Sequence, residues 1–125
     1  MEKNDLKKRA LEEQFMREKI FHDLKDVNTG FDVACISYFT EEEFDIVLQR
    51  IEKYKIDVYG IEPFFENEFY DVVCHEDYNI GANNPLWYRT AFDNFRKEKK
   101  GLQYAASYNI PIEVYEAFLR EKGLL

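Results

Sequence analysis

The start of a helix at Thr40 is the clearest structural signal in this sequence. Thr40 to Glu43 matches a capping box, in which the hydroxyl and the carboxylate each accept a hydrogen bond from the other residue's backbone amide. Phe39 and Phe44 stand where a hydrophobic staple places its two apolar residues. Apolar residues then recur at helical spacing as far as Lys55, so the pattern predicts an amphipathic helix that begins after Thr40.

Three apolar runs around this helix predict strands. Phe31–Phe39 (FDVACISYF) is rich in β-branched and aromatic residues and is bounded by turn signals, as a buried strand is. Residues 57–65 (DVYGIEPFF) and 69–77 (FYDVVCHED) are separated by three residues, which favours an antiparallel hairpin. Pro63 cannot donate to a ladder, so we expect the first hairpin strand at a sheet edge and the second inside the sheet.

Helices are predicted at both ends of the chain. Residues 2–24 are dominated by Lys, Glu, Leu and Ala and contain neither Gly nor Pro. A second helix is expected to start at Pro85 with Asn84 as its cap, and a last helix spans about 111–122. Residues 102–109 fit either a strand or a helix, and the helical alternative would form a helix-turn-helix with the last helix.

The order of these elements predicts an α+β fold in a single domain, residues 1–125. If 102–109 is a strand, residues 31–109 form a ferredoxin-like βαββαβ sandwich with an extra N-terminal helix and an extra C-terminal helix. Right-handed crossovers would place 31–39 and 69–77 side by side at the centre of its sheet. If 102–109 is helical, the C-terminal part becomes a helical subdomain.

Negative charge is concentrated in one segment. Residues 56–88 contain no Lys or Arg and carry −7 of the net charge of −8, with eight aromatic residues between the carboxylates. Such a chain repels phosphate backbones, which disfavours nucleic-acid binding. It attracts a basic protein, and exposed aromatic side chains can anchor one. The alternative is a solvated strand edge that discourages aggregation.

We therefore expect a non-enzymatic interaction module, an inhibitor, immunity-type protein or adaptor, that binds a basic protein partner. The expected partner-binding residues are the carboxylates and tyrosines of the hairpin region. They are Tyr59, Glu62, Glu66, Glu68, Tyr70, Asp71, Glu76, Asp77 and Tyr78.

No catalytic, cofactor-binding or metal-binding residue is predicted. Cys74 and His75 are adjacent on a predicted strand and point to opposite faces, so only His75 and Asp77 could share an ion, and two ligands are too few for a site. Cys35 and Cys74 are expected to be small buried residues on central strands without a redox role, because no flanking cation lowers either thiol pKa.

Two other functions remain open. One is a small-molecule-binding or enzymatic domain that uses an open sheet face lined by Tyr38, His75 and Tyr104. The other is a homo-oligomeric structural protein, such as a homodimer, whose N-terminal helix packs on a sister chain. Two cysteines, a charged N-terminus and no long apolar run predict a cytoplasmic protein without a secretory signal or membrane span.

The element order resembles that of the ribonuclease-E inhibitor B family, acidic ferredoxin-like proteins that begin with a helix and bind a basic nuclease. The resemblance covers the topology of roughly Asp5 to Tyr108, with the passage FDVACISYFTEEEF and the strand YDVVC as its most similar residues. The family's aromatic ending of the last strand is replaced by Gln103 to Ala106, and its very acidic tail is missing. No functional residue is carried over.

Overall fold

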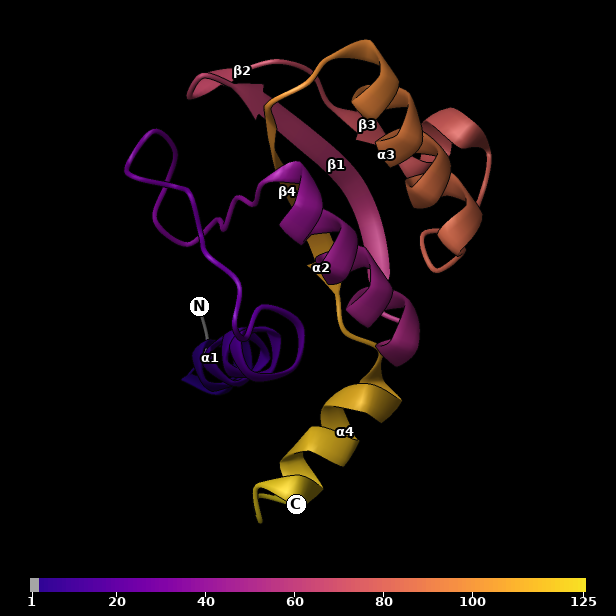
Figure 1. Cartoon of the computed structure of the whole chain (residues 1–125). Helices are drawn as coiled ribbons and strands as arrows, with labels where there is room; N and C mark the ends of the chain where they lie inside the picture. Colours follow the sequence, from indigo (N-terminus) through magenta and orange to yellow (C-terminus); the bar gives the residue numbers. More distant parts are fainter. Residues whose placement is uncertain (1–2) are drawn as a thin grey trace.

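The chain folds into four α-helices and a four-stranded antiparallel sheet, in a computed structural model that describes residues 3–125 (Figure 1). The α+β class predicted from the sequence is confirmed. In chain order the elements are α1 (Lys3–Phe15), the π-helical turn η1 (Met16–Ile20), α2 (Glu41–Tyr54), β1 (Asp57–Phe65), β2 (Glu68–Phe69), β3 (Val73–Cys74), the 3-10 turn η2 (His75–Tyr78), α3 (Pro85–Glu98), β4 (Leu102–Asn109) and α4 (Ile112–Glu121).

Strand β1 is the centre of the sheet. β4 pairs with one edge of it over its whole length, from Asp57 opposite Asn109 to Phe65 opposite Leu102, with a bulge after Val58. β2 and then β3 pair with its other edge. The expectation that this strand lies at a sheet edge is therefore wrong.

Pro63 is tolerated in this central strand because of where its missing donor would point. Tyr104 lies opposite Pro63 and turns its own N–H and C=O away from β1, so this position of the β1–β4 ladder needs no donor from Pro63. On the other edge of β1 the partner strand is interrupted, and the Pro63 carbonyl accepts from both Tyr70 N and Asp71 N. The predicted strand 69–77 is thus broken into β2, β3 and η2, and it does not lie inside the sheet.

Helices α2 and α3 cover one face of the sheet (Figure 1). The core between them is aromatic: the Tyr104 ring of β4 stacks on Phe44 at 5.1 Å and meets Phe92 edge-on at 5.0 Å. Buried Trp87 donates from its indole to the Val58 carbonyl at 3.2 Å, which ties α3 to β1. Burial of several rings in one cluster supplies much of the apolar area that stabilises a domain of this size.

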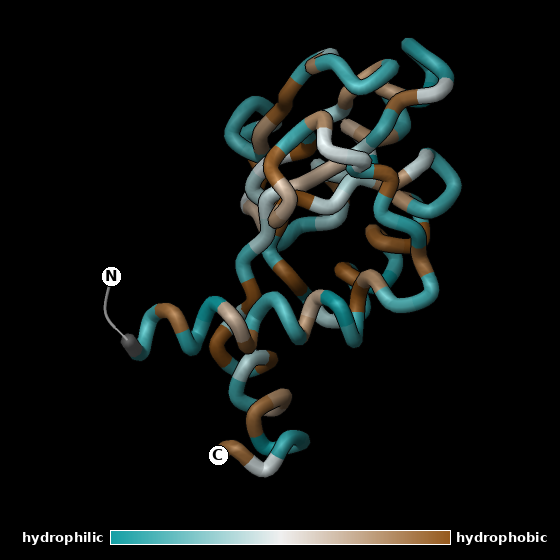
Figure 2. Tube along the Cα trace, turned by 90° about the vertical axis from the view of Figure 1, so that its left-hand side faces the viewer, coloured by the Kyte–Doolittle hydropathy of each residue, from teal (hydrophilic) through white to brown (hydrophobic). Residues whose placement is uncertain are grey.

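Helices α1 and α4 lie together at one end of the molecule, which also holds both chain ends (Figure 2). The Phe15 ring joins them, because it meets Phe118 edge-on at 5.4 Å and Tyr54 of α2 at 5.5 Å. The predicted helix 2–24 is correct from Lys3 as far as η1, where helical structure ends at Ile20, and residue 2 lies outside the described residues. Among the described residues, no helix has both the length and the apolar character that a bilayer crossing requires.

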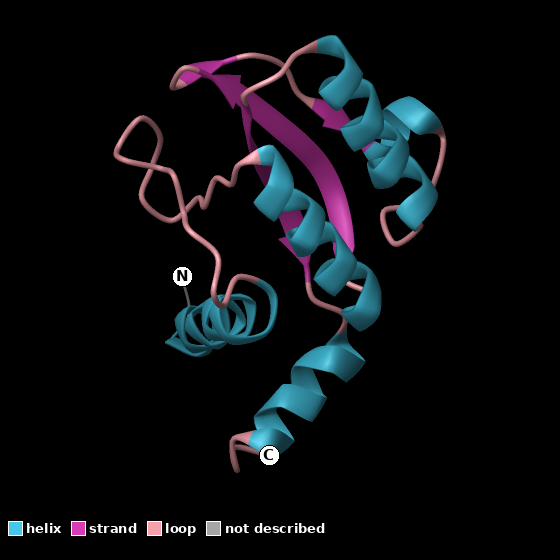
Figure 3. Ribbon diagram, in the orientation of Figure 1, coloured by secondary structure: helices cyan, strands magenta, loops and turns pink. Residues whose placement is uncertain are grey.

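The predicted strand Phe31–Phe39 is wrong except for its last residue. Residues 31–38 belong to a long loop between η1 and α2 (Figure 3), and only Phe39 pairs with β4, opposite Tyr104. The Asn28 side chain organises this loop: its amide donates to three carbonyls, and its oxygen accepts from two backbone amides. Such side-chain bonds give the backbone an alternative to a sheet ladder.

The ferredoxin-like order is consequently not confirmed. Its expected first strand is loop, and Phe39 contacts β4 rather than residues 69–77. The predicted helices after Thr40, Asn84 and Pro111 are confirmed, and 102–109 is a strand, which excludes a helix-turn-helix. The capping box forms only in part.

The Thr40 hydroxyl accepts from Glu43 N, as a capping box requires. The Glu43 carboxylate instead accepts from Lys25 N, so it bonds the loop rather than the first residue of the box.

Replacing Asn28 by alanine should destabilise the fold, because five loop backbone groups lose the side chain that satisfies them. We expect Asn28→Ala to lower the free energy of unfolding by about 1–3 kcal/mol, measured by urea denaturation. Asn94→Ala, at an exposed helical position of α3, is the control and should change it by less than about 0.5 kcal/mol. Equal stability of both variants would contradict the role of Asn28.

Candidate functional site

Five exposed carboxylates follow the edge of the sheet formed by β2 and β3, and we call them the acidic edge. They are Glu66, Glu68, Asp71, Glu76 and Asp77. The pairing of Phe65 with Glu68 and of Gly60 with Cys74 shows that the row extends along β1 by the five residue steps from Phe65 to Gly60. At the usual rise of a strand this is about 17 Å, the width of a protein-recognition surface rather than of a metal site.

A tight hairpin presents the first two carboxylates. Glu66 and Asn67 both have positive φ values, 50° and 69°, as the two central residues of a hairpin turn with left-handed backbone do. The loop is one residue shorter than predicted, since Glu68 already pairs with Phe65. Asn67 and Gln103 of β4 exchange two hydrogen bonds, at 2.9 and 2.8 Å, which hold the turn against the sheet.

The acidic edge is not neutralised within the chain. None of its carboxylates forms an ion pair with a Lys or Arg among the described side chains. Glu76 lies 3.1 Å from His75 Nε2, while Asp71 and Asp77 accept from Val72 N and Cys74 N. Glu66 and Glu68 have no hydrogen-bond partner for their carboxylates among the described residues.

Cations nevertheless lie close to this edge in space. Lys99, just after α3, has its Nζ 4.2 Å from the centre of the Phe65 ring. Tyr70 donates its hydroxyl to Glu98 at the end of the same helix, and this bond, with some burial, raises the Tyr70 pKa. The segment without cations is thus bordered by the basic C-terminus of α3 at its hairpin end.

The structure separates the three predicted tyrosines. Tyr59 is 45% exposed at the bulge of β1, with its ring centre 6.2 Å from that of His75 and much of its surface accessible to a partner. Tyr70 is held by Glu98 and packs edge-on against Phe95, and Tyr78 packs against Trp87 at 5.9 Å. Only Tyr59 is therefore placed as an anchor.

Two exposed apolar residues were missed from the sequence. Phe69 is 58% exposed and Val72 48% exposed, although residues 69–77 were expected to form a strand inside the sheet. Val72 is exposed because residues 70–72 leave the ladder opposite Pro63, whereas Phe69 still pairs with Phe64 and is exposed on the outer strand β2. The sequence signal that could have predicted this interruption is Pro63, which lies across the hairpin from the apolar run 72–74.

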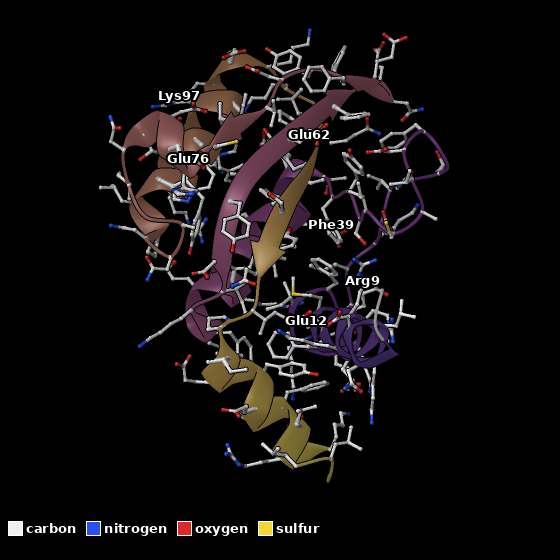
Figure 4. All side chains as sticks on the ribbon, turned by 180° about the vertical axis from the view of Figure 1, so that it is seen from behind. Arg9, Glu12, Phe39, Glu62, Glu76 and Lys97 are labelled. Atoms are coloured by element: carbon white, nitrogen blue, oxygen red, sulfur yellow. The ribbon has the colours of Figure 1, made fainter. Side chains whose placement is uncertain are left out.

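Glu62 lies apart from the acidic edge. It is half-buried on the face of the sheet opposite α2 and α3 (Figure 4), next to the loop 26–38. Burial, and secondly the charge of Asp32, raise the pKa of Glu62. Asp32 in turn accepts from the hydroxyl of fully buried Tyr38, and burial followed by this bond raises the Tyr38 pKa well above its ordinary value.

The alternative site of Tyr38, His75 and Tyr104 does not form. Tyr104 faces α2 and stacks on Phe44, whereas Tyr38 packs against Ala105, which points to the opposite face of β4. The Nδ1 atom of His75 lies 2.7 Å from the Ile80 carbonyl, a contact within its own turn. The three side chains therefore do not line one pocket.

Among the described residues, the two cysteines are not paired with each other and the potential metal ligands do not gather into a binding site. Cys35 is exposed in the loop and Cys74 is half-buried on β3, so the prediction of two buried cysteines on central strands is wrong. Burial, then the charges of Asp77 and Glu76, raise the pKa of the Cys74 thiol, which disfavours its reactive thiolate. The described residues contain no group of three or more His, Cys, Asp or Glu placed to hold a metal ion.

Comparison of the chain with protein-family models, with curated proteins and with solved structures gives no match. The site is therefore interpreted from its own geometry.

The raised pKa of Glu62 predicts a pH-dependent effect of its replacement. In the folded protein the charged form is disfavoured, so wild-type stability falls as pH rises from the ordinary carboxyl pKa through the raised one. Glu62→Gln should be more stable than the wild type at pH 7, and this gain should vanish below pH of about 4, where Glu62 is protonated in both states. Urea denaturation at the two pH values tests this, with Glu68→Gln as the exposed control. A Glu62→Gln variant that is less stable at pH 7 would contradict it.

Proposed function

We propose that this protein is a non-enzymatic interaction module that binds a basic protein through its acidic edge. One observation carries the proposal: five exposed carboxylates stand in a row along one sheet edge, and none forms an ion pair with a Lys or Arg among the described side chains. Asp71 and Asp77 accept hydrogen bonds from backbone amides and Glu76 lies beside His75, but no Lys or Arg among the described side chains neutralises any of the five. Their charge is available to another molecule.

The charge of the acidic edge mainly affects the rate at which a partner associates. Unpaired carboxylates within about 17 Å of one another add their potentials, which raises the association rate of a basic partner and fixes its orientation. Lys99 makes the field asymmetric, since it lies beside Phe65 and offsets the negative potential at the hairpin end of the row. A partner with a basic patch is thus expected to dock with that patch toward η2.

Exposed apolar side chains beside the carboxylates supply the short-range part of the contact. Tyr59, Phe69 and Val72 are each between 45% and 58% exposed. Aromatic residues of this kind provide much of the binding energy at protein interfaces when a partner removes them from water. Tyr59 and Phe69 are the residues we assign as anchors.

An inhibitor, an immunity-type protein or an adaptor would each use such a surface. The sequence resemblance to the ribonuclease-E inhibitor B family points to an inhibitor of a basic nuclease, but the element order on which it rests is not confirmed, because residues 31–38 form a loop. A partner of this type would place a basic active-site or docking surface against the acidic edge.

Neutralising part of the edge should weaken binding. In the variant Glu66→Gln, Glu68→Gln, Asp71→Asn, the side-chain shapes remain while three charges are lost. We expect the association rate with a basic protein captured from the native cell to fall about tenfold at low salt, and its salt dependence to flatten, as measured by surface plasmon resonance.

The matched control neutralises three carboxylates on other surfaces, Glu42, Glu113 and Glu116, none of which forms an ion pair among the described side chains. It loses the same net charge. If both variants bind equally well, a general charge effect is sufficient and the acidic edge is not the binding surface.

The anchor role of Tyr59 has a separate test. Tyr59→Ala should weaken partner binding by about 2 kcal/mol while leaving the urea midpoint close to that of the wild type. Tyr78→Ala, which removes a ring packed against buried Trp87, should instead lower stability with little effect on binding per folded molecule. The reverse pattern would exclude Tyr59 as an anchor.

A further inference from the structure

The outer edge of β4 is open beyond one pair of hydrogen bonds. Tyr104 donates to and accepts from Phe39 at 2.8 and 2.9 Å, so its backbone polar groups face away from β1. These groups alternate along a strand, so the N–H and C=O of Ala106 and Tyr108 face the same way. Neither residue has a backbone partner on this side among the described residues.

The segment that would cover this edge turns away from it. Continuing the antiparallel register of Phe39 with Tyr104 would put Ser37 opposite Ala106. This pairing does not form, because the bridge at Phe39 is isolated and the loop bonds within itself on either side of Ser37. The Ile36 carbonyl accepts from the Asn28 amide, and Tyr38, whose backbone faces away from β4, bonds to Asp26 and Val27. The chain therefore leaves β4 immediately before Phe39.

A groove of about 470 Å³ opens where the two segments separate. Its walls come from three parts of the chain that are distant in sequence: the end of β4, residues 34–37 of the loop, and one side of α1 and η1. Met16, Phe21, Ile36 and Ile110 make much of it apolar, and its volume is within the range of ligand sites. The buried hydroxyl of Tyr108, whose side chain lines the groove, has no hydrogen-bond partner among the described residues.

The wall formed by α1 and η1 carries two arginines, Arg9 and Arg17, without ion partners among the described side chains. Glu12 and Glu13 also line the groove, so this wall is neutral in a chain with a net charge of −8. Figure 4 shows Arg9 and Glu12 on the side of α1 that faces β4 and the loop. A carboxylate is repelled less here than over most of the surface, and guanidinium groups bind carboxylates through paired hydrogen bonds.

We propose that this groove binds the C-terminal end of a short extended peptide. The peptide backbone pairs with the open N–H and C=O groups of Ala106 and Tyr108, which adds a strand to the sheet. Its apolar side chains contact Met16 and Ile36, and its terminal carboxylate is bound by Arg9 and Arg17. The site is on the other edge of the sheet from the acidic edge and does not depend on the function proposed for that edge.

The probe is an acetylated peptide of about four residues that alternates valine and threonine and ends in a free carboxylate, about 13 Å long when extended. Cys35 lines the groove and is exposed, so its alkylation rate in a Cys74→Ser background reports occupancy. A saturating amount of the peptide should slow alkylation about tenfold, as for a site that is nine-tenths occupied. The same peptide with an amidated end, or with N-methylated valines, should bind at least about tenfold more weakly.

Two pairs of variants assign the contacts. Ala106→Pro removes the outward N–H and leaves the ladder to β1 intact, so it should abolish the protection of Cys35 from alkylation by the peptide. Ala106→Val should retain this shielding of Cys35. Arg9→Ala with Arg17→Ala should reduce the preference for the free carboxylate, and Lys7→Ala with Lys8→Ala, on the same helix, should not. If the proline variant does not fold, Ala34→Trp blocks the groove from the opposite wall and should also abolish shielding.

Three results would overturn the proposal. Equal binding of the amidated peptide would exclude capture of a C-terminus, and equal binding of the N-methylated peptide would exclude strand addition. Shielding of Cys35 that increases with protein concentration without peptide would show that a second copy of the chain occupies the groove instead.

Discussion

The two hydrogen bonds between Phe39 and Tyr104 determine much of the architecture. They are the only place where the long loop after η1 joins the sheet by backbone pairing within the described residues. They also hold Tyr104 at the centre of the aromatic core, between Phe44 of α2 and Phe92 of α3. Helix α2 begins two residues after Phe39, so its packing on the sheet starts from this pair.

Both proposed binding surfaces depend on the direction of the Tyr104 backbone. Because its polar groups face outward, Pro63 opposite it needs no donor toward β4, and its missing N–H falls on the other edge of β1. The partner strand is interrupted there, which exposes Val72, and Phe69 and the carboxylates of the acidic edge are exposed along the same side of the sheet. On the outer side, the same orientation leaves Ala106 and Tyr108 open to the groove.

The sequence predicted the elements that depend on local signals. The helices capped by Thr40 and Asn84, the strand 57–65 and the last helix were correct, because caps, turns and periodicity act within a few residues. The sequence left 102–109 open between strand and helix, and the pairing with β1 decides for the strand. The strand Phe31–Phe39 failed because competing side-chain bonds from Asp26 and Asn28 cannot be read from apolar content.

The candidate site was predictable in composition but not in arrangement. The carboxylates of the acidic edge are exposed, as charge alone suggests, whereas Glu62, Tyr70 and Tyr78 are held by burial or by partners from distant elements. The groove could not be inferred at all, since its walls come from α1, the loop and β4. Lys99 beside Phe65 likewise shows that a stretch without cations in sequence is not isolated from them in space.

Hydrogen exchange of individual backbone amides tests this account most directly, because it reads each edge of β4 separately. The amides of Phe39 and Tyr104 should exchange slowly, as should those of Gln103 and Ala105, whereas Ala106 and Tyr108 should exchange rapidly in the free protein. Slow exchange of Ala106 and Tyr108 together with residues 33–37 would show a full strand on this edge, which would contradict both the open groove and the single pair on which the fold depends.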